Sequence, residues 1–128
     1  MDEEVVGKAV LAATMVFAGV ALVWTARATA SGRLGRNPIA GVRTAVTMAD
    51  DEAWLTAHQA ARTPTEVAGW CAVVFGVAAA LVPGMPLAAS IAGIGAVVML
   101  VLVLVGARRG VRAVKAGVDE HPSPEHGG

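Results

Sequence analysis

Charge is scarce in this chain and is absent from the positions where it would indicate ion transport. Lysine plus arginine equals aspartate plus glutamate at 10 each, so the formal net charge is zero. No bulk electrostatic attraction to nucleic acid is therefore expected. Charged residues make up only 16% of the chain, and none interrupts the middle of its three long apolar stretches. Because ionisable groups inside a membrane usually mark the path of an ion, their absence argues against an ion pump.

Residues that could form a disulfide or hold a metal ion are equally scarce. The single cysteine, Cys71, cannot form a disulfide within the chain and is most simply a small packing residue. Three consecutive acids, Asp50, Asp51 and Glu52, would point in different directions on a helix and could not ligate one ion together. Neither a metal site nor another cofactor is expected.

Apolar residues, in contrast, fill three stretches at residues 5–26, 64–82 and 86–107. A helix rises ~1.5 Å per residue, so ~20 apolar residues match a hydrocarbon core of ~30 Å. The sequence predicts an all-α membrane protein with three transmembrane helices. A single membrane domain is expected over residues 1–118, followed by a disordered tail at 119–128. Because three spans form a thin bundle, a second copy or a larger membrane complex is a candidate partner, besides the membrane lipids.

The first apolar stretch is interpreted as a retained helix. Ala28-Thr29-Ala30 looks like a signal-peptide cleavage site, but the chain begins with acids at residues 2–4, where a signal peptide carries positive charge. The stretch is also longer than the apolar core of a typical signal peptide.

Positive charge follows the first and the third stretch. Five arginines lie in the connecting loop, and four cations follow the third stretch; they are Arg27, Arg33, Arg36, Arg43, Arg62 and then Arg108, Arg109, Arg112, Lys115. The turn at residues 82–86 carries no charge. Because cytoplasmic segments accumulate lysine and arginine, the N-terminus is predicted outside, with the loop at residues 27–63 and the C-terminus in the cytoplasm.

Threonine and proline mark the predicted helix boundaries. The sequence TPTE at residues 63–66 has the pattern of a capping box with proline at the first helical position, which predicts the start of the second span. Thr47 followed by Asp50 predicts the cap of a separate short helix over residues 48–62. We expect this helix to lie along the inner membrane surface, with Trp54 at headgroup depth.

Small residues recur at every fourth position of the second and third stretches. They are Ala68, Ala72, Gly76 and Ala80 in the second and Ala88, Ala92 and Ala96 in the third. Such ridges allow helices to approach closely in a membrane, although alanine and glycine are common throughout this chain. The short turn at residues 82–86, which contains two prolines and a glycine, predicts more directly that these spans form a hairpin.

The loop between the first two spans carries a distinctive set of residues. It comprises Asn37, Gly41, Val42, Arg43, Thr44, Thr47, Trp54 and His58. This set, with one span before it and two after it, resembles the C-terminal-type domain of the SdpI family of small bacterial membrane proteins. The resemblance covers about residues 5–115. It implies a multi-pass plasma-membrane protein without enzymatic activity, which gives immunity to a membrane-active toxin peptide or signals its presence to a cytoplasmic regulator.

Two of these loop residues admit more than one role. The guanidinium of Arg43 suits a phosphate, a carboxylate or a cluster of carbonyls, so a lipid headgroup or an acidic partner is a reasonable ligand. Alternatively, Arg43 pairs internally with one of the acids at residues 50–52, while Asn37 and Gly41 shape the turn. His58 is expected to be a hydrogen-bonded partner more than a base.

Two other functions remain open from the sequence. The chain could be an accessory subunit of a larger membrane complex. It could also act on lipid headgroups through Arg43, His58 and one of the acids, but no nucleophile–base pair at a suitable spacing supports such an enzyme.

Overall fold

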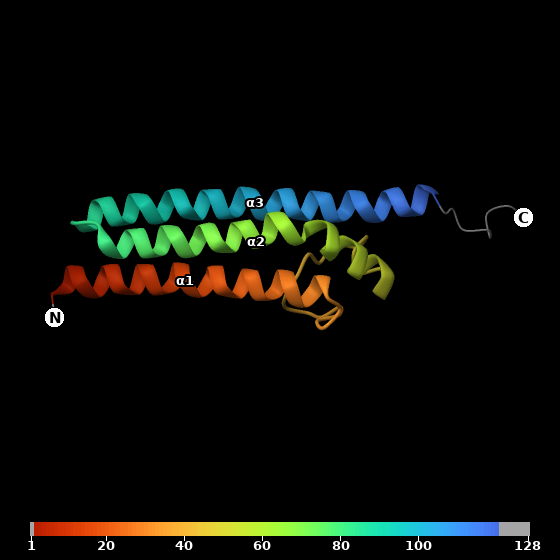
Figure 1. Cartoon of the computed structure of the whole chain (residues 1–128), viewed down its shortest axis with the longest axis horizontal. Helices are drawn as coiled ribbons and strands as arrows, with labels where there is room; N and C mark the ends of the chain where they lie inside the picture. Colours follow the sequence, from red (N-terminus) through yellow and green to blue (C-terminus); the bar gives the residue numbers. More distant parts are fainter. Residues whose placement is uncertain (1, 121–128) are drawn as a thin grey trace, which may run out of the picture.

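The structure is a computed structural model that describes residues 2–120, with side chains up to residue 117. It contains three helices and, within those residues, no strand: α1 (Glu3–Ala30), α2 (Asp51–Leu81) and α3 (Met85–Glu120) (Figure 1). Each helix is long and apolar enough to cross a membrane, which confirms the predicted all-α fold with three spans. The predicted tail at residues 119–128 lies outside the described residues, except that its first two positions end α3.

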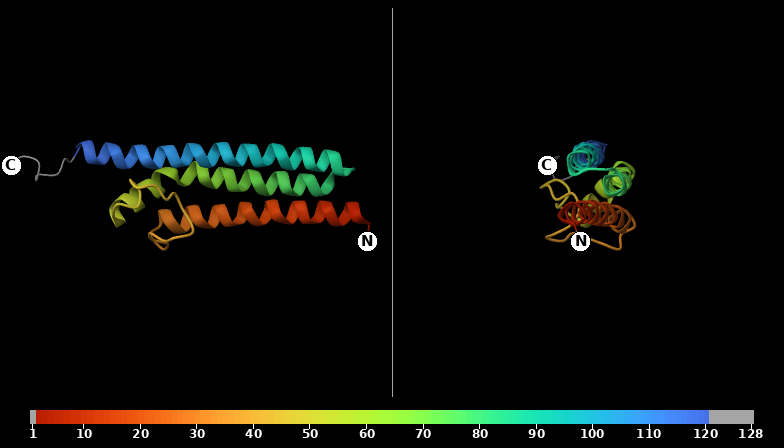
Figure 2. Two further views of the ribbon diagram at one scale, coloured as in Figure 1. Left: turned by 180° about the vertical axis from the view of Figure 1, so that it is seen from behind. Right: turned by 90° about the vertical axis from the view of Figure 1, so that its left-hand side faces the viewer.

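The three helices run side by side, with α2 in the middle. α2 packs along both α1 and α3, whereas α1 and α3 contact each other only sparsely. The end-on view in Figure 2 shows the same arrangement, with α1 and α3 held apart on one side of α2. We call the end of the bundle that carries the connection at residues 31–50 the loop end, and the end with the α2–α3 turn the turn end.

Glycine allows α1 and α2 to touch through their backbones. A Cβ atom added to Gly19 would lie 2.4 Å from the carbonyl oxygen of Gly69, and one added to Gly69 would lie 2.6 Å from that of Gly19. Neither position has room for a side chain. Helices in lipid associate through such close approaches, because burying apolar side chains against each other gains little over burying them in lipid.

The predicted ridges of small residues are only partly buried. Ala68, Ala72 and Gly76 face the other helices, but Ala80 is exposed; in α3, Ala88 and Ala92 are buried and Ala96 is exposed. A helix has ~3.6 residues per turn, so a four-residue repeat rotates by ~40° at each step. The end of each ridge therefore turns out of the interface, and Gly95 replaces Ala96 in the contact of α3 with Phe75.

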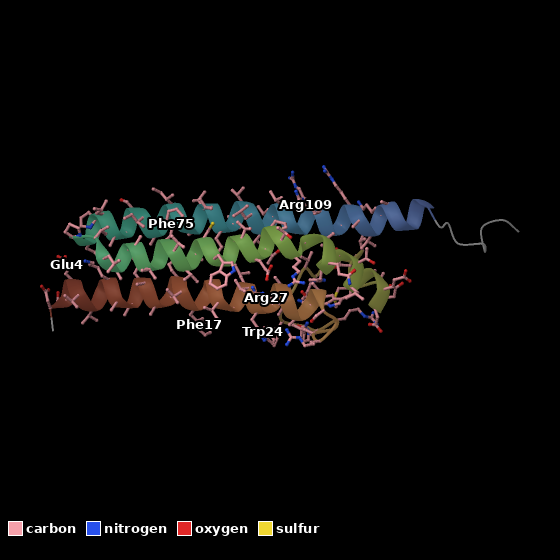
Figure 3. All side chains as sticks on the ribbon, in the orientation of Figure 1. Glu4, Phe17, Trp24, Arg27, Phe75 and Arg109 are labelled. Carbon is pink, nitrogen blue, oxygen red and sulfur yellow. The ribbon has the colours of Figure 1, made fainter. Side chains whose placement is uncertain are left out.

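Large apolar side chains cover the outside of the bundle. Phe17 is 77% exposed and Leu81 is 78% exposed. Figure 3 shows Phe17 and Trp24 pointing away from the other two helices. Such exposure is typical of a surface that faces lipid, and it agrees with the apolar lengths of the helices.

The start of α2 differs from the prediction. The Asp50 carboxylate accepts a hydrogen bond of 2.7 Å from the backbone N–H of Ala53, so Asp50 is the N-cap and the predicted caps Thr47 and Thr63 are wrong. Pro64 is buried inside the helix, and the predicted short helix is continuous with the second span. Proline removes one backbone donor and typically bends a helix, and Figure 1 shows the first turns of α2 inclined to the rest.

Packing against α3 explains why α2 continues through Pro64. The carbonyl oxygen of Ala57 lies 2.8 Å from where a Cβ on Gly110 would stand, and the side-chain hydroxyl of Thr65 lies 2.8 Å from where a Cβ on Gly106 would stand. These contacts on both sides of the proline stabilise a helix that local sequence signals would end.

Glu66 has a different partner from the one that the capping pattern predicts. Its carboxylate pairs with Arg27 of α1 and lies 3.6 Å from Nε of Arg62, one turn earlier in α2. It therefore links α1 to α2 near the loop end of the apolar stretches and does not cap a helix.

At the turn end, Lys8 links α1 to the hairpin. Its ammonium group donates a hydrogen bond to the carbonyl oxygen of Val82, the residue that follows the last turn of α2. Because that turn contains no basic residue of its own, Lys8 supplies the positive charge that favours a helix C-terminus.

Candidate functional site

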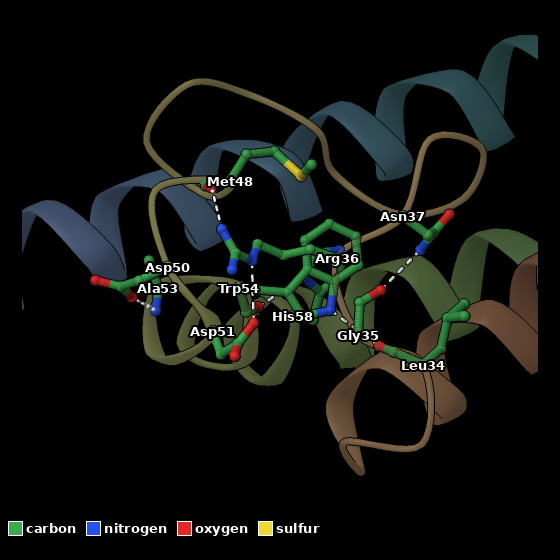
Figure 4. Close-up of polar contacts among 10 residues, drawn as sticks. All are labelled: Leu34, Gly35, Arg36, Asn37, Met48, Asp50, Asp51, Ala53, Trp54 and His58. Carbon is green, nitrogen blue, oxygen red and sulfur yellow. Dashed lines mark hydrogen bonds and ion pairs between the residues drawn. The ribbon is translucent and has the colours of Figure 1, made fainter.

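The loop at residues 31–50 folds back over the first turns of α2 at the loop end of the bundle (Figure 4). Trp54 and His58 stand four residues apart and so share one face of α2, and their rings stack with centroids 4.1 Å apart. Gly41 and Val42 of the loop contact these two rings. The structure therefore brings four of the predicted motif residues into one cluster.

His58 is buried, with 4% of its surface exposed, and both ring nitrogens have backbone partners. The N–H of Val42 donates to Nε2 at 2.8 Å, and Nδ1 lies 2.7 Å from the carbonyl oxygen of Trp54. Because Nε2 accepts a hydrogen bond, Nδ1 must carry the proton and donate to that carbonyl. The ring is held as one neutral tautomer.

The surroundings of His58 favour this neutral form. The residue lies six positions before Pro64, outside the apolar stretch of α2. Burial lowers the pKa of His58 below 6.5, and the hydrogen bond to the Trp54 carbonyl opposes this shift only in part. A histidine whose acceptor nitrogen already binds a backbone N–H cannot take a substrate proton unless the loop moves away.

Trp54 is covered by the loop and is not exposed on the surface of α2. It is 2% exposed, and its indole N–H donates to the carbonyl oxygen of Leu34 at 2.9 Å. The loop covers the ring, so Trp54 serves as a buried anchor for the chain that leaves α1. Helical periodicity in the sequence predicts on which face of a helix a residue lies, but it does not predict which other segment covers that face.

Gly41 occupies a position that only glycine fits. Its φ of +104° is a conformation that other residues rarely adopt. A Cβ at this position would also lie 2.7 Å from Nε2 of His58 and 2.7 Å from Cη2 of Trp54. The loop backbone therefore passes directly over the two rings.

Asn37 shapes the turn that leads to Gly41. Its side-chain oxygen accepts hydrogen bonds from the backbone N–H groups of Ile39 and Ala40, at 2.9 and 2.7 Å. Its side-chain amide donates to the carbonyl oxygens of Gly35 and Ala40, at 2.8 and 3.0 Å. All of these bonds stay within the turn, as in other turns built on asparagine.

Thr44 and Thr47 close the next turn through reciprocal hydrogen bonds. The hydroxyl of Thr47 accepts from the N–H of Thr44 at 2.9 Å and donates to the carbonyl oxygen of Val42 at 2.7 Å. In return, the N–H of Thr47 donates to the hydroxyl of Thr44 at 3.2 Å. Thr47 is fully buried, so its role is to hold Val42 and thereby the contact with His58.

Arg43 differs from every other polar residue of the motif. It is exposed, and its guanidinium makes neither a hydrogen bond nor an ion pair with any of residues 2–117, whose side chains the structure describes. The internal pairing that the sequence left open for Arg43 is made by Arg36, which bonds to Asp51 and to the carbonyl oxygen of Met48, at 3.0 Å each (Figure 4).

Sequence reasoning missed this role of Arg36. It is one of five arginines in the loop region, and no fixed spacing relates it to Asp51. Only its position beside Asn37 could have drawn attention to it. In the structure, Arg36 and Arg43 both line a shallow depression of about 430 Å³, whose other walls are Asn37, Pro38, Met48 and Asp51.

The arrangement exposes one cation, Arg43, on a loop that the other motif residues hold in place. The motif residues other than Arg43 bond to the loop itself or to α2, so they fix the backbone on either side of this one arginine. In the described part of the chain, no three histidine, cysteine or acidic side chains lie close enough together to hold a metal ion.

Comparison with known protein families tests the resemblance that the motif suggested. The model of the SdpI/YfhL protein family matches residues 33–107, which is more than half of the chain. The chain belongs to the SdpI/YfhL family. The matched segment contains every motif residue from Asn37 to His58, all of α2 and most of α3, whereas α1 precedes it. No curated protein and no solved structure matched the chain in the corresponding comparisons.

Proposed function

We propose that this SdpI-type membrane protein gives immunity to a membrane-active toxin or signals its presence, and that Arg43 is the group through which its loop binds a partner. The observation that carries the proposal is the contrast within the motif. The surrounding motif side chains are engaged inside the protein, while Arg43 is exposed and has no partner among the side chains and backbone groups described for residues 2–117.

A fixed loop makes such an arginine effective in binding. The contacts of Gly41 and Val42 with α2 order the backbone before a partner arrives, so binding costs less conformational entropy. A guanidinium forms paired hydrogen bonds with a carboxylate or a phosphate. An acidic segment of a toxin or of a regulatory protein has the chemistry that Arg43 would recognise.

We infer a role in binding and not in catalysis. The SdpI/YfhL family is not known for enzymatic activity. The motif histidine, His58 of α2, also has both nitrogens engaged with backbone groups, so it does not supply a free base. An enzyme acting on lipid headgroups is therefore the weaker alternative.

The excess of positive charge in and after the loop supports a cytoplasmic location for the loop end. This orientation can be tested with Ala45, which is exposed in the loop. We would introduce Ala45→Cys together with Cys71→Ala and treat cells with a membrane-impermeant maleimide. Labelling only after the cells are opened is expected; labelling of intact cells would contradict the orientation.

The function itself can be tested in cells that lack the gene. These cells would be complemented with the wild type, Arg43→Gln or Arg33→Gln, and challenged with secreted membrane-active peptide toxins. Arg33 is an exposed loop arginine whose one side-chain bond is to Ser31, so it controls for general loss of charge. We expect Arg43→Gln to lose protection or the transcriptional response, with Arg33→Gln unchanged. Equal survival and transcription with and without the gene would refute the proposal.

A further inference from the structure

A small apolar groove lies at the loop end of the bundle, on the side where α1 and α3 stand apart. It has a volume of about 110 Å³ and is lined by all three helices and by the loop. Leu22 of α1, Thr65 of α2 and Val103 of α3 form its walls, while Gly41 and Val42 of the loop lie at its loop-end limit. The groove is partly open to the outside of the bundle. The end-on view in Figure 2 shows the ribbons of α1 and α3 separated from each other, consistent with their sparse contacts.

Two arginines and one acid stand beside this groove. Arg62, which lines the groove, and Arg27 both pair with Glu66, so the three side chains carry one surplus positive charge. Both guanidiniums are about half exposed, with side chains 49% and 51% accessible. Arg62 engages only its Nε atom among the described residues, which leaves the two terminal amino groups available as donors.

From this combination we propose that the groove is a binding site for one phospholipid with an anionic headgroup, from the leaflet at the loop end. A section of an acyl chain lies between α1 and α3, and the phosphate lies against the terminal amino groups of Arg62. The site is separate from Arg43, and its existence does not depend on the proposed function.

The size of the groove favours an acyl chain over a protein segment. A helix with its side chains is ~10–12 Å across and cannot enter a space of this volume. Apolar cavities of ~150 Å³ take up a molecule the size of benzene, so about 110 Å³ accommodates a short length of hydrocarbon. The surplus charge next to it selects an anionic headgroup over a zwitterionic one.

The test uses the full chain reconstituted in phosphatidylcholine vesicles, with spin-labelled phosphatidylglycerol and spin-labelled phosphatidylcholine as probes. Electron paramagnetic resonance measures the immobilised fraction of each lipid. We expect the wild type to prefer phosphatidylglycerol by about fivefold, the ratio for one surplus cation near the membrane surface.

Two variants distinguish the part of the groove that binds the acyl chain from the part that binds the headgroup, and each has a matched control. Val103→Trp fills the groove and should lower the immobilised fraction of both probes, whereas the adjacent, exposed Leu104→Trp should not. Arg62→Gln should bring the preference close to one without loss of phosphatidylcholine binding, whereas the exposed Arg109→Gln should keep it.

Three results would overturn the inference. The first is the absence of a selective immobilised component in the wild type. The second is an equal loss of selectivity in Arg109→Gln, which would show a general effect of positive charge. The third is a change in the mass of the detergent-solubilised protein in Val103→Trp, which would show that a second copy of the chain occupies the groove.

Discussion

Gly41 makes the packing of the loop testable, because the loop contains two other glycines for comparison. One of them lacks only the steric overlap of Gly41, and the other lacks both the overlap and the positive φ. Gly35 has an ordinary φ, and a Cβ there would meet no atom within 4 Å. Gly32 has a φ of +82° but the same open surroundings. Gly41 combines a φ of +104° with overlap against His58 and Trp54. Substitution by alanine therefore separates backbone strain from steric overlap.

The expected losses in the free energy of unfolding follow this order. Gly35→Ala should change it by no more than about 0.5 kcal/mol, as at other open surface positions. Gly32→Ala should cost about 1–2 kcal/mol, the strain of a left-handed residue. Gly41→Ala should cost the same backbone strain and also the hydrogen bond from the Val42 N–H to His58, whose loss leaves a buried group unpaired at about 1–3 kcal/mol. The expected total loss in the free energy of unfolding is about 3 kcal/mol.

Trp54 reports directly on this contact. Trp24 and Trp70 are exposed, so both can be replaced by phenylalanine to leave Trp54 as the single fluorophore. The fluorescence emission of Trp54 then follows loop docking as the protein in detergent is titrated with denaturant. We expect Gly41→Ala to undock at clearly lower denaturant than Gly32→Ala, and Gly35→Ala to match the parent. If Gly41→Ala were no less stable than Gly32→Ala, the close approach of the loop to the two rings would be refuted.

Three further predictions concern other parts of the structure. Burial holds His58 neutral with a lowered pKa, so its contribution to stability is complete above about pH 6.5 and is lost as the pH falls below that value. Undocking midpoints should therefore decline toward about pH 5, and an equal decline in His58→Gln would contradict this. Asp50→Ala should lower the free energy of unfolding by about 1 kcal/mol, because the N-cap of α2 is lost. Asp51→Ala should lower it by less, because the Asp51 side chain is 90% exposed. Equal midpoints of the two variants in denaturant titrations would be evidence against the observed start of α2. Lys8→Met should lower the thermal unfolding temperature in detergent by removing the charged donor to Val82, whereas Lys115→Met, an exposed position, should leave it unchanged.

The three spans could be predicted from sequence because their signal is a physical length. An apolar run must be long enough to cross the hydrocarbon core of the bilayer, and contacts with neighbouring helices do not change the length that is required. The hairpin of α2 and α3 was equally accessible, since the turn at residues 82–84 is too short for another arrangement. The SdpI resemblance was also confirmed over residues 33–107.

The boundaries at residues 47–66 could not be predicted from the same local signals. Thr63 and Pro64 carry the usual marks of a helix start, but contacts of Ala57 and Thr65 with α3 stabilise the helix on both sides of the proline. Thr47 has the side chain of a cap, yet Asp50 takes that role while Thr47 bonds to Val42. In each case a tertiary contact decided between two locally acceptable conformations.

The motif residues lie in the loop and on the first turns of α2, but their surroundings could not be predicted from the sequence. Trp54 was expected at headgroup depth, and its burial under the loop, with the indole N–H bonded to the carbonyl oxygen of Leu34, was not foreseen. The exposure of Arg43 and the internal pairing of Arg36 depend on how the loop folds in space. Neither follows from spacing along the chain.

The first turns of α2 contact both the loop and α3. Trp54 and His58 hold the loop, and Ala57, on the same two turns, presses against Gly110 of α3. A short piece of helix is stiff, so these contacts cannot shift independently. The loop and the basic end of α3 thus contact the same turns of α2, so a displacement of these turns would alter both contacts.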